Sequence, residues 1–165
     1  MNIQLRPFNA ADATALQQAA DNNHIAANLR NTFPVPYQLK DAEQYIFSVS
    51  ERTPQTDFVI EVDGVFAGRI AIDLKDDIYS TTAEIGYWIA EPFWGRGIAT
   101  RAIGQMVKCA TDTFDRVRLF AVCFESNYGS RKALENNGFT LEAIRKKAVI
   151  KNGEILNDCV YTIIL

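Results

Sequence analysis

The stretch that decides the fold reads Glu84-Ile-Gly-Tyr-Trp-Ile89, then Ala-Glu-Pro-Phe-Trp-Gly95, then Arg-Gly97-Ile-Ala99-Thr100-Arg-Ala. It begins in a predicted β-strand, Thr82 to Ile89, and a helical pattern follows from Ile98 to about Thr113. Small residues at Gly95, Gly97 and Ala99 let an anionic ligand approach the backbone. There the first helical N–H groups have no helical partner and the helix dipole is positive. This strand, turn and helix start are suited to binding a pyrophosphate.

Three other interpretations of the same turn compete with pyrophosphate binding. The glycines taken alone are equally compatible with a tight strand-to-helix turn that binds nothing. A dinucleotide-binding fingerprint fits poorly, because Thr100 stands where its third glycine belongs. A Walker-type phosphate loop is excluded, because it ends in Gly-Lys-Ser/Thr and Ala99 precedes Thr100 here.

The N-terminal half predicts a strand, two helices and a hairpin. Alternation predicts a strand at Ile3 to Arg6, and periodicity predicts one helix through Leu16, capped by Asn9 or Asp12, and another at Leu39 to Ser50. The segment His24 to Tyr37 contains two prolines and is predicted as a loop between helices. Two β-rich runs, Phe58 to Val62 and Val65 to Leu74, flank Asp63-Gly64, which is typical of a hairpin turn.

The C-terminal half continues with a strand, a helix and a second hairpin. A strand at Leu119 to Phe124 leads to a helix at Asn127 to Asn136, which Gly138 ends as a left-handed cap. Two final strands, Leu141 to Ile150 and Ile155 to Leu165, are joined by Asn152-Gly153. This order of elements predicts one α/β (α+β) domain over residues 1–165, with a mixed sheet and helices on its faces.

Composition excludes several classes of protein. Of the 165 residues 48% are hydrophobic, which is enough to bury one core, and a net charge of -3 without a dense basic run argues against nucleic acid as a partner. The N-terminus is too polar for a secretory signal, and no apolar stretch reaches the roughly 20 residues of a membrane helix, so we expect no membrane partner and a cytoplasmic location. Cys109, Cys123 and Cys159 suit neither a disulfide framework nor a zinc site, and we expect no metal.

Two motifs carry a resemblance to a known family. The run Trp94-Gly-Arg-Gly97-Ile-Ala99 resembles the Gln/Arg-x-x-Gly-x-Gly/Ala coenzyme A motif of the GNAT N-acetyltransferases, with Trp94 departing at the first position. Asn127-Tyr-Gly-Ser130 and the later Gly138-Phe139 resemble the family's Asn-x-x-Ser helix and its terminal Gly-Phe. The surrounding sequence is similar to the RimJ/RimL-like ribosomal-protein N-terminal acetyltransferases, in which an aromatic residue at the departing position is familiar. The specific matches lie between Glu84 and Phe139.

This resemblance implies a fold and a cosubstrate. The fold is a central, mixed, mostly antiparallel sheet of about seven strands, flanked by about four helices and splayed between strands 4 and 5. The cosubstrate is acetyl-coenzyme A, whose pantetheine arm pairs with the fourth strand and whose pyrophosphate meets backbone N–H groups of the turn. The implied cosubstrate-binding residues are Tyr87, Trp88, Ile89, Trp94, Gly95, Arg96, Gly97, Ile98, Ala99, Thr100, Asn127 and Ser130. Taken singly, Asn127 as a helix cap, Ser130 as an incidental hydroxyl, and the two tryptophans as packing residues are equally probable.

The family's chemistry is a direct attack of a neutral amine on the thioester, without a covalent enzyme intermediate. Two residues used in other branches are replaced here, since Val122 stands at the position of a possible glutamate base and Leu134 at that of a tyrosine acid. Glu84 is then the candidate base, acting through water, and Ser130 the candidate acid for the thiolate. A solvated or salt-bridged carboxylate is the competing interpretation of Glu84.

The acceptor is expected to be the α-amino group of a protein or peptide N-terminus. An α-amine has a pKa near 8, well below about 10.4 for lysine, so a larger fraction of it is already neutral and a weaker base is sufficient. Acceptor contacts are expected from Phe33, Tyr37, Glu84 and Tyr128, while His24 is assigned no role. Alternatives are acetylation of a small amine (polyamine, aminoglycoside or amino acid) and an acyl-coenzyme A-binding module without turnover. The oligomeric state is left open, with a symmetric homodimer as one alternative.

Overall fold

The computed structural model describes all residues from Met1 to Leu165, and its strands form a seven-stranded sheet in the order β1-β2-β3-β4-β5-β7-β6. The β4–β5 pair is parallel, and β1–β2, β2–β3, β5–β7 and β6–β7 are antiparallel. Parallel pairing joins only Thr82–Glu84 to Arg118–Phe120, although both strands continue beyond these residues. The strands are β1 (Ile3–Pro7), β2 (Asp57–Val62), β3 (Val65–Leu74), β4 (Thr82–Ile89), β5 (Arg118–Phe124), β6 (Thr140–Lys151) and β7 (Glu154–Ile164).

Five α-helices and three short 3-10 helices complete the element order. The short α2 overlaps the start of the segment His24 to Tyr37 that was predicted as a loop. It forms there because the Asn22 side chain caps it by accepting from His24 N and Ile25 N. The prolines lie beyond its end. The α-helices are α1 (Ala13–Ala20), α2 (Asn23–Ala26), α3 (Leu39–Ser50), α4 (Ile98–Phe114) and α5 (Tyr128–Glu135); the 3-10 helices are η1 (Ala10–Asp12), η2 (Asp77–Tyr79) and η3 (Glu91–Phe93).

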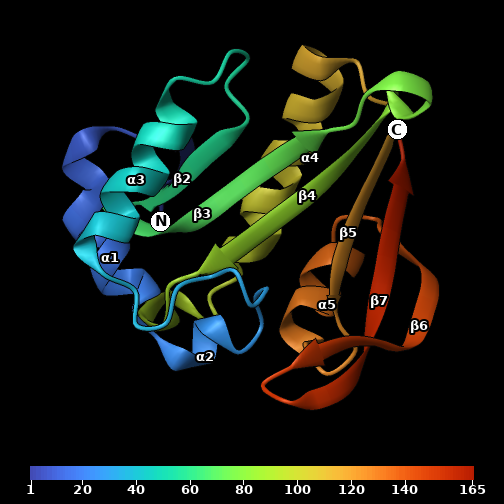
Figure 1. Cartoon of the computed structure of the whole chain (residues 1–165). Coiled ribbons are helices and arrows are strands. Elements are labelled where there is room, and N and C mark those ends of the chain that lie inside the picture. Colours follow the sequence, from blue (N-terminus) through green and yellow to red (C-terminus); the bar gives the residue numbers. More distant parts are fainter. The chain divides into compact units, whose positions relative to one another are not determined.

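Two compact units divide the chain. The first comprises Met1–Ala71 and Tyr87–Ile98, and the second comprises Ile72–Gly86 and Ala99–Leu165. In the first unit α1 packs against α3, and both accompany β2 and β3 in Figure 1. The core of this unit is built from apolar faces of these elements, including Phe8, Leu16, Ile46, Val49, Val59, Phe66 and Trp88.

The second unit is built on β5, β6 and β7, which lie side by side in Figure 1 with α5 packed against β5. One face of β5 is apolar and fully buried at Leu119, and α4 buries Ile103 and Met106 in the same way. The hairpin turn at Asn152-Gly153 has positive φ at both residues (51° and 81°), as predicted. The edge strand β6 is exposed along almost its whole length and carries a bulge between Arg145 and Val149.

No helix of the chain combines the length and the apolar character needed to span a membrane.

Candidate functional site

The loop between β4 and α4 has the geometry that its glycines predicted. Gly95 and Gly97 adopt positive φ of 73° and 71°, a left-handed conformation that other L-residues rarely adopt. A Cβ atom on either residue would have no heavy atom within 4 Å, so the space beside this backbone is open. Because α4 begins at Ile98 and runs for 17 residues, its first N–H groups follow directly after the two glycines. Open backbone, left-handed glycines and a helix N-terminus fit an anionic group.

Trp94, the residue that departs from the family motif, connects this loop to the end of β4 by a hydrogen bond. Its indole Nε1 donates a hydrogen bond of 2.6 Å to the carbonyl oxygen of Ile89. The ring is 46% exposed, so packing alone does not hold it. The Ile89 carbonyl, at one of the positions expected to pair with pantetheine, therefore accepts a hydrogen bond from the loop itself.

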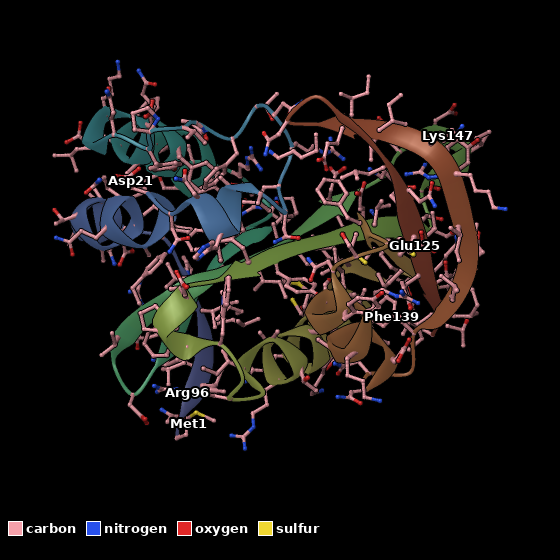
Figure 2. The ribbon with its side chains drawn as sticks, turned by 90° about the horizontal axis from the view of Figure 1, so that it is seen from below. Met1, Asp21, Arg96, Glu125, Phe139 and Lys147 are labelled. Atoms are coloured by element: carbon pink, nitrogen blue, oxygen red, sulfur yellow. The ribbon has the colours of Figure 1, made fainter.

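A positive charge lies on the same loop. The Arg96 side chain is exposed at the turn, as Figure 2 shows, and its guanidinium carbon lies 5.5 Å from the centre of the Phe93 ring. A cation over an aromatic face is held weakly and remains available to an anion. Arg96 thus places an exposed positive charge on this loop.

Glu84, the candidate base, is paired with a lysine. Lys75 Nζ donates to Glu84 Oε2 at 3.1 Å and to Asp73 Oδ2 at 2.5 Å, and it lies 5.6 Å from the centre of the Phe120 ring. The two carboxylates raise the pKa of Lys75, mainly through the Asp73 hydrogen bond, so this lysine stays charged. Glu84 also contributes to the raised pKa of Arg145, whose main cause is its hydrogen bond to Asp158. The salt-bridged interpretation of Glu84 therefore describes this structure.

The N-terminus of α5 carries the second motif. Asn127 is the N-cap, and its Oδ1 accepts a hydrogen bond of 3.1 Å from Ser130 N. The Ser130 side chain also lies near the thiol of Cys123 on β5, where it acts to lower the pKa of that thiol. The structure thus brings Asn127 and Ser130 together, with Asn127 acting as a helix cap and the Ser130 hydroxyl next to a sulfur atom.

Burial raises the pKa of the Cys123 thiol to about 11, and the Ser130 side chain opposes this only in part. Cys123 is paired across the strands with the buried Cys159, and the chain has no disulfide. Both thiols are therefore protonated at neutral pH.

Two of the predicted acceptor residues lie in an aromatic cluster of the first unit. The Phe33 ring lies 5.1 Å from that of Tyr37 and 6.5 Å from that of Trp88, centre to centre. Tyr37 is only 5% exposed, and burial raises its pKa to about 12. Tyr128 differs, because the residue is 72% exposed, and the guanidinium carbon of Arg131 lies 5.5 Å from the centre of its ring.

Sequence reasoning missed two side chains next to the predicted residues. Lys75 was not expected as the partner of Glu84, and no role was predicted for Asn137, whose amide donates to the carbonyl of Thr100. A lysine nine residues from Glu84 carries no signal by itself. Lys75 directly follows β3 and its backbone N donates to Thr82 O at the start of β4, so the pairing of these two strands brings it near Glu84. The replaced acid position, Leu134, is fully buried. No group of three or more His, Cys, Asp or Glu is arranged to hold a metal.

Comparison with known proteins identifies the family. The family model described as "Acetyltransferase (GNAT) domain" matches residues 2–140. The chain belongs to this GNAT acetyltransferase family. Its fold agrees, because the RimL ribosomal L7/L12 α-N-protein acetyltransferase in complex with coenzyme A superposes with a TM-score of 0.88 at 21% identity, covering 100% of this chain and 95% of that chain. The RimJ protein of Mycobacterium smegmatis, in complex with a coenzyme A disulfide, gives 0.86 at 26% identity, covering 98% and 81%. The predicted family and fold class are confirmed.

Relatives in the family differ in the activity for which they are named. The chain is 35% identical over 101 residues to the ribosomal-protein-serine acetyltransferase of Escherichia coli (strain K12), and 33% identical over 99 residues to the putative ribosomal N-acetyltransferase YdaF of Bacillus subtilis (strain 168). These matches cover 61% and 60% of the chain but only 53% of each relative, so the chain spans about half the length of both. It is 27% identical to the spermidine N(1)-acetyltransferase of E. coli (strain K12) over 161 residues, covering 94% of the chain and 82% of the relative.

Proposed function

We propose that this chain is an acetyl-coenzyme A-dependent N-acetyltransferase that transfers an acetyl group to a primary amine, and that its acceptor is the α-amino group of a protein or peptide N-terminus. The observation that carries the proposal is the loop Gly95–Gly97 before α4, with two left-handed glycines, open space beside them and the unpaired N–H groups of a 17-residue helix. Membership of the GNAT family supports acetyl-coenzyme A, whose pyrophosphate is anionic, as the ligand of this loop.

The cosubstrate supplies an acetyl group activated as a thioester. The amine nitrogen forms a bond to the acetyl carbonyl carbon, the carbon–sulfur bond breaks, one N–H proton leaves the amine and one proton reaches the sulfur. The protein must position the amine, accept the first proton and supply the second. The residues proposed to hold the cosubstrate are those of the β4 end and the loop, Tyr87 to Ile89 and Trp94 to Thr100, together with Asn127 and Ser130.

Glu84 is the proposed proton acceptor, through a water molecule. Its carboxylate is held by the Lys75 ammonium at 3.1 Å, so an incoming ammonium group competes with Lys75 for the same oxygen atoms. Lys75 has a second carboxylate, Asp73, at 2.5 Å and keeps a charged partner when it leaves Glu84. A weak base of this kind suits an α-amine, whose pKa near 8 leaves a substantial neutral fraction at physiological pH.

Ser130 is the proposed proton donor to the leaving thiolate. Its side chain acts to lower the pKa of the nearby Cys123 thiol, and a hydroxyl that stabilises one thiolate supports the suitability of this position for another. A Ser130→Ala change is expected to reduce kcat with little effect on the KM for the acceptor, because the hydroxyl acts on sulfur and not on the amine.

A thiol-release assay tests the proposal. Acetyl-coenzyme A is incubated with the protein and with peptides that begin in Ser, Ala or Met, and the matched control is each peptide with an acetylated N-terminus. Release of coenzyme A with free peptides only supports the proposal. Tight coenzyme A binding without thiol release on a broad panel of amines favours the non-catalytic binding module instead.

A small amine is the second candidate acceptor. The observation in its favour is the alignment with the spermidine N(1)-acetyltransferase of E. coli (strain K12), which extends over 94% of the chain, whereas the ribosomal-protein relatives align over about 60%. Spermidine and free amino acids therefore belong in the same assay, and the acceptor with the highest kcat/KM identifies the substrate class.

A further inference from the structure

The first turn of α4 is held from outside by one side chain. The Asn137 amide nitrogen donates to Thr100 O of α4 at 2.9 Å and to Ala133 O of α5 at 2.8 Å. An amide NH₂ has two N–H donors, so both are used. Asn137 lies just past the end of α5, two residues before the buried Phe139 that Figure 2 labels.

The hydrogen-bond acceptor on α5 is the carbonyl oxygen of Ala133, which has no donor within its own helix. The backbone N–H of Asn137 bonds Leu134 O instead of continuing the helix to Ala133 O. Ala133 O is therefore one of the last carbonyl groups of α5, which lack intrahelical donors. The Asn137 side chain satisfies it and uses its remaining N–H to reach α4.

A glycine in the middle of α4 makes room for this amide. A Cβ atom on Gly104 would lie 3.0 Å from Asn137 Oδ1, which is closer than side-chain carbons normally approach an oxygen. Glycine inside a helix costs about 1 kcal/mol relative to alanine, so Gly104 needs a compensating reason. Gly104 lies one helical turn after Thr100, and the close approach of the Asn137 side chain there supplies that reason.

The position of this contact matters because Thr100 is the last residue of the proposed pyrophosphate-binding loop. The N–H groups without helical acceptors end at Thr100, so the Asn137 bond to Thr100 O acts on the turn as a whole: it holds the first turn of α4, which begins at Ile98, against the end of α5. Preorganised N–H groups bind an anion better than N–H groups in a fraying helix end, because less ordering remains to be done on binding.

We propose that Asn137 is a positioning residue for coenzyme A: its amide fixes the first turn of α4 against the end of α5, and Gly104 is required so that it fits. This inference rests on the proposed function. It differs from a purely structural role, because it predicts a loss that depends on the diphosphate of the ligand.

The test compares Asn137→Leu, which has nearly the same size and no donor, with Asn136→Ala at the exposed neighbouring position as the matched control. We measure kcat/KM for acetyl-coenzyme A and for S-acetylpantetheine, which lacks the diphosphate, and the Kd of coenzyme A by calorimetry. Asn137→Leu is expected to weaken coenzyme A binding about five- to tenfold, on the order of one lost hydrogen bond, and to leave kcat/KM for S-acetylpantetheine within about twofold. Asn136→Ala is expected to change neither value.

A second variant keeps the test decisive if Asn137→Leu does not fold. Gly104→Ala retains the amide but displaces it, and it is expected to show the same selective loss with acetyl-coenzyme A. Equal losses with both thioesters, or a lower melting temperature with unchanged coenzyme A affinity, would overturn the inference. Failure of the wild-type protein to bind coenzyme A would instead refute the proposed function.

Discussion

At the scale of single residues, Gly97 combines two properties that the proposed function needs. Its φ of 71° is left-handed, and the position of its absent Cβ atom is open. A side chain there costs about 1–2 kcal/mol of backbone strain but collides with nothing in the protein. A change at this position therefore acts on a ligand more than on the fold.

The first prediction uses this difference. Gly97→Glu is expected to lower coenzyme A affinity at least 100-fold, because a carboxylate would stand beside the proposed diphosphate, while the protein still folds cooperatively. Asn tolerates left-handed φ and has no charge, so Gly97→Asn is the control, with a much smaller loss expected. Calorimetric titration measures both, and micromolar affinity in Gly97→Glu would refute the placement of the diphosphate.

Trp94 gives a second prediction at this scale. Trp94→Phe removes the 2.6 Å indole bond to Ile89 O and retains an aromatic ring, so the loop loses about 1 kcal/mol of anchoring. Coenzyme A affinity is expected to fall severalfold with a melting temperature within about 2 °C of wild type, measured by titration and differential scanning fluorimetry. An unchanged affinity would mean that the indole bond does not order the loop.

The thiol of Cys123 gives a third. Because burial raises its pKa to about 11, the folded protein should react with iodoacetamide at pH 7.5 roughly 100-fold more slowly than an ordinary thiol, and faster as pH rises toward 11. Peptide mass spectrometry follows the labelling, and the urea-unfolded protein is the control. Rapid labelling of Cys123 in the native protein would show that this thiol is not protected.

At the scale of elements, ion pairs connect the strands to the segments around them. Arg6 of β1 donates to Asp12 at 2.7 and 2.9 Å and to Glu61 of β2 at 2.5 Å. Burial alone would raise the pKa of Asp12, but the hydrogen bonds from Arg6 and from Asn9 N outweigh it, so its pKa is lowered. Asp12 thus ties the start of the first helical segment to the edge of the sheet.

The fourth prediction follows from the sign of that shift. The folded pKa of Asp12 lies below its unfolded value near 3.9, so its contribution is complete above about pH 4 and is lost as pH falls through the folded pKa. Asp12→Asn is expected to cost about 2 kcal/mol at pH 7 and progressively less in acid. Urea unfolding at pH 7, 5 and 3 measures this. A deficit that is constant with pH would contradict the assignment.

At the scale of the whole molecule, a ligand that binds only the folded chain raises its stability by mass action. Coenzyme A at 100 times its Kd should add about 2.7 kcal/mol. For 165 residues this corresponds to a rise in melting temperature of roughly 8 °C, measured by calorimetry. Inorganic phosphate at the same concentration is the control. A shift with phosphate equal to that with coenzyme A would mean that any anion stabilises the chain without a specific site.

Short-range rules explain what the sequence alone determined. Asp63-Gly64 and Asn152-Gly153 have positive φ at all four residues, as their hairpin interpretation predicted, and Gly95 and Gly97 are left-handed before a helix. Periodicity located the strands, and the long helix from Ile98 ends one residue beyond its predicted end, at Phe114. Turn conformations and periodicities depend on residues a few positions apart, so a sequence contains them in readable form.

Only the tertiary structure decided which distant groups meet. In the folded chain β7 lies between β5 and β6, and the β4–β5 pairing is limited to three residue pairs. Lys75 also forms an ion pair with Glu84. The fold also joined Asn137 to Thr100 across 37 residues of sequence. Such contacts depend on how whole elements pack, and no local pattern encodes them. The family was therefore readable from short motifs, whereas the partners of its proposed catalytic and binding residues were not.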